Sequence, residues 1–97
     1  MDIKRALRNV QETGKVTLGF KETMKQIKKK KVKMVIVAKN CPDEDLKELK
    51  DQKVPIYTYE GNNQELGAAS GKPFSISTFG VIDGGQSDIL VLKGTKE

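Results

Sequence analysis

The apolar run Met34–Ala38 constrains the fold of this chain more than any other feature. It places five apolar residues in succession, in a chain whose residues are 32% charged. A strand exposed on one face alternates apolar and polar residues, whereas a continuously apolar strand is covered on both faces. The 97 residues are enough for one modest core and too few for two. We therefore expect one domain, spanning residues 1–97, with a central strand buried between two layers.

Segments of helical and strand-like pattern alternate along the chain. Apolar spacing, capping residues and glycines predict four helices: residues 2–13, two segments that begin near Phe20 and Pro42, and a short one after Asn62. Strands are predicted at residues 15–18, 34–38, 54–59, 74–82 and 88–92, with Pro55 at a strand entrance or a sheet edge. This alternation predicts an α/β fold, a three-layer α/β/α sandwich around a mixed sheet of four to five strands.

The composition argues against catalysis and metal binding. There is no histidine, which is the commonest general acid/base and metal ligand, and Cys41 is the only cysteine. A lone cysteine fits a reduced compartment, and neither a secretory signal nor an apolar run of about 18 residues is present. The two Gly-Lys pairs do not fit a phosphate loop, because Val16 and Pro73 stand where Ser or Thr is required. A non-enzymatic protein without cofactor or metal is expected.

Positive charge is concentrated in the first part of the chain. Residues 1–39 hold 12 of the 18 basic residues and three of the 13 acids, a balance of +9, whereas residues 40–97 carry −4. Such a basic segment indicates a surface that faces a polyanion, most often nucleic acid. A solubilising lysine-rich helix face is the alternative.

The strongest candidate site lies where the first strand meets the second helix. A glycine permits close approach of another backbone, and the free N–H groups at a helix start attract phosphate oxygens. Lys21, Lys25 and Lys29 recur at four-residue spacing, so they line one helical face. Glu22 either accepts hydrogen bonds from a base or complements the helix dipole. The candidate residues in this segment are Gly19, Phe20, Lys21, Glu22, Lys25 and Lys29.

Two later segments hold further candidates. Amides are dense at the start of the fourth helix, and amides suit base edges and sugar hydroxyls in irregular RNA, although capping accounts for one Asn. Phe74 is either a core residue or, if exposed near Lys72, a platform on which a base stacks. The turn at residues 83–85 either only reverses the chain or touches an extruded base. These candidates are Asn62, Asn63, Glu65, Gly67, Phe74, Asp83, Gly84 and Gly85.

Four segments in order resemble a known family. They are residues 18–25, 38–42, 61–67 and 83–89, and together they resemble the L30e family of archaeal and eukaryal large-subunit ribosomal proteins. This family belongs to the L7Ae superfamily of kink-turn RNA-binding proteins, and the resemblance covers essentially the whole chain. It implies an α/β/α sandwich that binds large-subunit ribosomal RNA at a kink-turn or similar internal loop. The three candidate segments above would then form one RNA surface.

The resemblance also implies a cytoplasmic protein of the ribosome, which contacts neighbouring ribosomal proteins and is a monomer off the ribosome. Three alternatives stay open. The first is a non-ribosomal kink-turn module of an RNA-modifying particle or translation factor. The second is a small α/β enzyme, and the third is a chromatin protein that binds without sequence preference. The enzyme lacks a nucleophile–base pair in the sequence, and the chromatin protein predicts equal affinity for duplex DNA.

Overall fold

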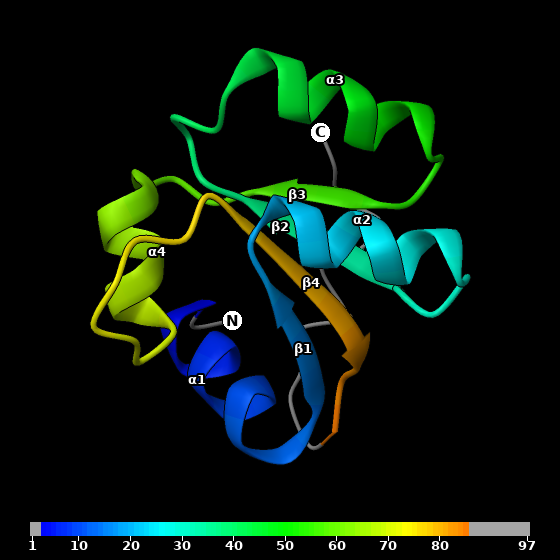
Figure 1. The fold of residues 1–97 in the computed structure, drawn as a ribbon. Helices are drawn as coiled ribbons and strands as arrows, with labels where there is room; N and C mark the ends of the chain where they lie inside the picture. Colours follow the sequence, from blue (N-terminus) through cyan, green and yellow to red (C-terminus); the bar gives the residue numbers. More distant parts are fainter. Residues whose placement is uncertain (1–2, 86–97) are drawn as a thin grey trace.

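The computed structural model of the protein describes residues 3–85. Helices and strands alternate along the chain as predicted (Figure 1). The elements are α1 (Ile3–Thr13), β1 (Lys15–Leu18), α2 (Phe20–Lys28), β2 (Met34–Val37), α3 (Asp43–Asp51), β3 (Ile56–Thr58), α4 (Asn63–Ala69) and β4 (Thr78–Asp83).

The four strands form a mixed sheet in the order β1-β4-β2-β3. β4 pairs antiparallel with both β1 and β2, and β2 pairs parallel with β3. Consequently β1, β2 and β3 all run in one direction and β4 runs in the other. The carboxyl ends of β1, β2 and β3 therefore meet the amino end of β4 at one end of the sheet, which decides where the candidate residues gather.

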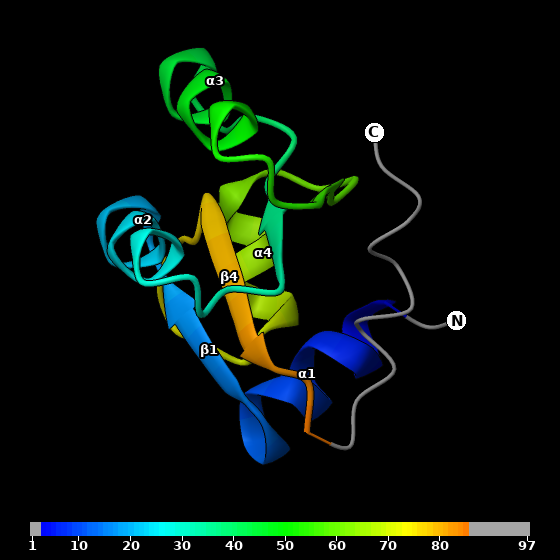
Figure 2. The ribbon, with the colours of Figure 1, turned by 90° about the vertical axis from the view of Figure 1, so that its right-hand side faces the viewer.

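Helices cover both faces of the sheet, as a continuously apolar β2 requires. All four residues of β2 are buried, and alternate side chains enter different apolar clusters. Met34 and Ile36 pack with residues of α1 and α4, whereas Val35 and Val37 pack with residues of α2 and α3. Figure 2 shows α2 and α3 on one side of the sheet and α1 and α4 on the other. The predicted three-layer α/β/α sandwich is confirmed.

Two predicted strands are shorter than expected. β3 keeps only residues 56–58 of the predicted 54–59, and it is an edge strand that follows Pro55 as the proline predicts. β4 begins at Thr78, although the β-prone stretch begins at Phe74. The backbone of residues 76–77 bonds instead to α4 and to the residue after β2, which removes it from the ladder. The predicted strand at residues 88–92 and the predicted cap at Asp2 lie outside the described residues.

Candidate nucleic-acid interface

Three successive residues tie three distant segments together at one end of the sheet. The N–H of Ile76 donates to the carbonyl of the first residue of α4 at 2.9 Å. The carbonyl of Ser77 accepts from the residue after β2 at 2.9 Å, and that of Thr78 accepts from the N–H of Gly19 at 2.8 Å. These bonds bring the start of α2, the end of β2, the start of α4 and the loop before β4 into one surface. We call it the site end.

The start of α2 is open toward solvent at the site end. Gly19 has φ 95°, a region that favours glycine, and as N-cap it offers no side chain to the first N–H groups of the helix. Lys21, Glu22 and Lys25 are all exposed. The Glu22 carboxylate accepts one hydrogen bond, from Nε2 of Gln26 at 3.1 Å, so it retains acceptor capacity for a ligand. The geometry is suited to a phosphate at the helix start beside a carboxylate that accepts from a base.

The start of α4 is more strongly satisfied than the sequence indicates. Asn62 and Glu65 form a capping box, with Asn62 Oδ1 accepting from the Glu65 N–H at 2.9 Å and Glu65 Oε1 accepting from the Asn62 N–H at 2.8 Å. Asn63 is bound to Asn40, whose Oδ1 accepts from the Asn63 N–H at 2.8 Å. The Nδ2 group of Asn40 donates to Asn63 Oδ1 at 3.1 Å. Local structure therefore uses most of the amide groups, and only the remaining donors and acceptors are left for a ligand.

Gly67 and Phe74 take different roles in the same contact. Gly67 is buried, and a Cβ built on it would overlap the carbonyl oxygen of Phe74. Its role is thus to let the loop before β4 pack against α4, not to touch a ligand. Phe74 itself is 52% exposed, the single large hydrophobic residue so exposed among the described residues. Of its two predicted roles the core role is excluded, because more than half of the side chain is exposed.

Two of the predicted α2 residues contribute little to the open start of the helix. Phe20 is half-buried and packs against the apolar cluster under α2, so most of its ring is a core contact. Lys29 is exposed at the C-cap of α2, roughly 13 Å along the axis from Phe20 at ~1.5 Å per residue. Lys21 and Lys25 thus belong to the site end, whereas Lys29 lies at the other end of α2.

The turn at residues 83–85 is not brought together with the other candidates. Asp83 ends β4, about 17 Å from Thr78 at ~3.3 Å per residue. Asp83 Oδ1 accepts from the N–H of Gly85 at 2.9 Å, and Gly85 lies against Thr13 and Gly14 at the end of α1. Gly84 is buried. The expectation of one surface containing all three segments is therefore corrected, because the antiparallel direction of β4 carries this turn to the opposite end of the sheet.

The structure adds site-end residues that the sequence did not single out. Lys39 and Asn40 are exposed directly after β2, and the Lys39 N–H donates to the carbonyl of Gly61 at 2.8 Å. Lys72 lies in the loop before β4, where its N–H donates to the carbonyl of Gly67 at 3.0 Å. For Lys39 and Asn40 the sequence contains one indication, which is their position: polar residues directly after a buried strand lie at the carboxyl end of that strand.

Cys41 is buried beside the site end. Burial raises the pKa of its thiol, and so do the charges of Asp45 and Asp43, whereas a hydrogen bond with Thr78 opposes the shift. A thiol that stays protonated is a poor nucleophile. Within residues 3–85, no group of three or more His, Cys, Asp or Glu side chains is placed to hold a metal ion. No helix of this part of the chain is long and apolar enough to cross a membrane.

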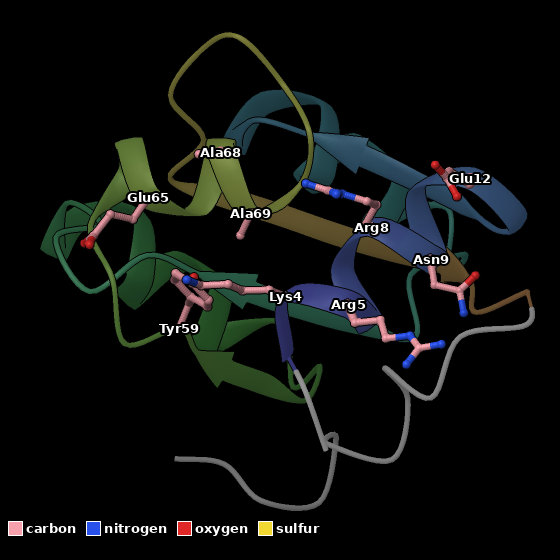
Figure 3. Close-up of a pocket in the computed structure, with 9 residues that line it drawn as sticks. All are labelled: Lys4, Arg5, Arg8, Asn9, Glu12, Tyr59, Glu65, Ala68 and Ala69. Atoms are coloured by element: carbon pink, nitrogen blue, oxygen red, sulfur yellow. The ribbon is translucent and has the colours of Figure 1, made fainter.

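An open groove of about 700 Å³ lies between α1 and α4. Figure 3 shows that Lys4 extends toward Tyr59 and that Arg8 points across from α1 toward α4. The pKa of Tyr59 is raised by its burial and by the nearby charge of Glu65. The lining mixes cations, acids and small apolar residues: Lys4, Arg5, Arg8, Asn9, Glu12, Tyr59, Glu65, Ala68 and Ala69. It adjoins the site end through Glu65, and no pattern in the sequence predicts it.

The fold and the site end define an α/β/α protein whose exposed lysines, carboxylate and aromatic ring surround a helix start. The sequence profile of the "Ribosomal protein L7Ae/L30e/S12e/Gadd45 family" matches residues 1–91. Similar proteins named "Large ribosomal subunit protein eL30" occur in several archaea. That of Methanoregula boonei is 44% identical over 96 residues, covering 98% of this chain and 99% of the relative. That of Methanothermobacter thermautotrophicus is 43% identical, covering 97% and 100%.

A third relative of the same name, from Sulfurisphaera tokodaii, is 47% identical over 88 residues and covers 87% of this chain and 83% of its own length. The match to the family is essentially full-length, and identity is far above the level at which folds diverge. The chain therefore belongs to the ribosomal protein L7Ae/L30e/S12e/Gadd45 family.

Proposed function

We propose that this protein is a structural component of the large ribosomal subunit and binds ribosomal RNA at a kink-turn or a similar internal loop. In that role it acts in the cytoplasmic ribosome, catalyses no reaction and contacts neighbouring ribosomal proteins, and it is a monomer when free. The ribosomal part is supported by relatives that are named as large-subunit proteins and match along nearly their whole length. The RNA-binding part is supported by the site end.

The observation that carries the RNA proposal is the junction at residues 76–78. Its three hydrogen bonds fix an exposed helix start, an exposed aromatic ring and several lysines on one surface. Lysines and a free helix start bind backbone phosphates, the Glu22 carboxylate reads a base amino or imino group, and Phe74 stacks on an unpaired base. Unpaired and splayed bases are found in irregular internal loops and not in regular duplex, so this set of groups fits such a loop.

A titration with three nucleic acids tests this function. At about 150 mM salt, we expect tight binding to a kink-turn RNA and much weaker binding to the same RNA with its sheared G·A pairs replaced by Watson–Crick pairs. Duplex DNA should bind no better than this control RNA. Equal, weak and salt-sensitive binding to all three would show that the basic residues form only a charged surface. Affinity for a large-subunit fragment relative to guide-RNA kink-turns then separates the ribosomal protein from a module of an RNA-modifying particle.

Substitutions at Lys25 and Glu22 separate positioning from base readout. We expect Lys25→Ala to weaken binding to all RNAs and to reduce the slope of log K against log salt by roughly one unit, because one phosphate contact is lost. Glu22→Ala should instead remove preference for the kinked RNA by about 1–3 kcal/mol, with little change in the salt slope. Both values come from filter-binding titrations across a salt series. Unchanged affinity in both variants would show that α2 is not part of the RNA-binding site.

A further inference from the structure

The end of the sheet opposite the site end carries eight exposed lysines. Because β1, β2 and β3 run in one direction, the residues that begin or precede them meet there. Lys15 begins β1, Lys33 precedes β2 and Lys53 precedes β3. The last turns of α2 and α3 end at the same side of the molecule (Figure 1). The exposed lysines of this lysine end are Lys15, Lys28, Lys29, Lys30, Lys31, Lys33, Lys50 and Lys53.

These eight lysines face few acids. The acids placed at this end by the fold are Asp83, the register partner of Lys15, and Asp51 at the end of α3. One oxygen of Asp83 is already used by the N–H of Gly85. Within residues 3–85, no ion pair joins any of the eight lysines to a carboxylate. The eight lysines therefore outnumber the acids that the fold places at this end, which favours an anionic partner over a self-neutralised surface.

Two backbone conformations argue that the lysines do more than solubilise helix ends. Lys30 and Lys53 each have φ 60° at the position that follows the C-cap of α2 and of α3, where glycine is the favoured residue. Complementing the helix dipole explains a lysine in the last turn of a helix, but not Lys15 or Lys33, which begin or precede strands. The backbone of Lys33 is fixed to the sheet, since its N–H donates to the carbonyl of Val81 at 2.7 Å.

The chemistry at the lysine end fits phosphates and not bases. Its cations are all lysines, which act as point charges, and no arginine or aromatic side chain stands among them for bidentate or stacking contacts. We propose that the lysine end is a second RNA-binding surface, which contacts the phosphate backbone of an RNA helix other than the one held at the site end. The protein then bridges two RNA segments from opposite ends of one sheet. This inference rests on the proposed function for the first RNA segment only.

Binding of a second RNA to a preformed complex tests the proposal. The protein is first saturated with unlabelled kink-turn RNA, and a fluorescent RNA duplex of about 16 base pairs is then titrated while anisotropy is recorded. We expect a ternary complex with a Kd between roughly 1 and 100 µM, typical of sequence-independent binding. The triple variant Lys31→Gln, Lys33→Gln, Lys53→Gln should bind the duplex at least about tenfold more weakly, with a salt slope lower by roughly two to three.

A charge-matched variant controls for net charge. Lys4→Gln, Arg5→Gln and Arg8→Gln remove the same number of charges from exposed positions of α1, away from the lysine end, and this variant should bind the duplex like the wild type. Affinity for the kink-turn RNA is expected to change less than about twofold in the lysine-end variant, because its residues lie outside the site end. Circular dichroism melting of both variants checks that they fold.

Each alternative result has a definite meaning. Equal duplex affinity in the two triple variants would overturn the second surface, and so would displacement of the kink-turn RNA by the duplex. If the wild type does not prefer the kink-turn RNA, but its duplex binding still depends on the lysine end, the proposed function fails and the second surface stands. Loss of kink-turn binding in the lysine-end variant would show that the two ends form one binding surface, and the proposal that the protein bridges two RNA segments would be overturned.

Discussion

Replacing Gly67 with alanine is expected to lower the free energy of unfolding by about 2–3 kcal/mol, the cost of overpacking a closely packed position. Gly67 is buried in α4, and an added Cβ would overlap the backbone carbonyl of Phe74, which cannot rotate away as the end of a side chain can. The loop before β4 must then move off α4. Because the same loop bonds to α4 through Ile76 and to Gly19 through Thr78, we expect RNA affinity to fall as well.

Chemical denaturation and RNA titration of the same variant separate these effects. Gln64→Ala is the matched control, since it changes an exposed residue of the same helix and should alter stability by less than about 0.5 kcal/mol. A Gly67→Ala protein as stable as the wild type would contradict the close packing of this loop. A destabilised protein that still binds RNA normally when folded would show that the loop position does not matter to the site.

Replacing Phe74 with alanine is expected to have the opposite profile, with a large effect on RNA binding and little on stability. The ring is 52% exposed, so its removal leaves no core cavity and should change the free energy of unfolding by less than about 0.5 kcal/mol. If a base stacks on the ring, affinity for the kink-turn RNA should fall by about 1–3 kcal/mol, which is roughly 5- to 150-fold. Fluorescence titration of labelled RNA measures the change.

Phe74→Trp provides the control for stacking, because indole presents a larger aromatic face and should keep or increase the affinity. Equal loss in the alanine and tryptophan variants would mean that the ring fits a shaped pocket and does not stack. An alanine variant with wild-type affinity would remove Phe74 from the interface and leave the lysines and the start of α2 to carry binding.

Much of the fold is determined by the sequence because its signals are local. Met34–Ala38 demands cover on both faces, and alternating apolar periods predict the helices and strands that provide it. The start of α2 is similarly predictable, since a glycine followed by Phe20, Met24 and Ile27 marks a helix start without reference to the rest of the molecule. The resemblance to the L30e family adds the expected overall fold and RNA surface, which local patterns do not provide. The family profile agrees with this resemblance.

The arrangement of the site was decided by tertiary structure, because strand direction and exposure are not local properties. The residues around Asp83 do not predict the direction of β4. Because β4 runs antiparallel to β1 and β2, the turn at its end lies far from Gly19. Nor does the sequence near Phe74 show that residues 76–77 bond to α4 and to the residue after β2, or that the Phe74 ring is exposed. Lys15, Lys33 and Lys53 are 38 positions apart from first to last, and only the shared direction of β1, β2 and β3 brings them to one end. Composition and periodicity thus determined the layers, and the pairing of strands determined which residues meet.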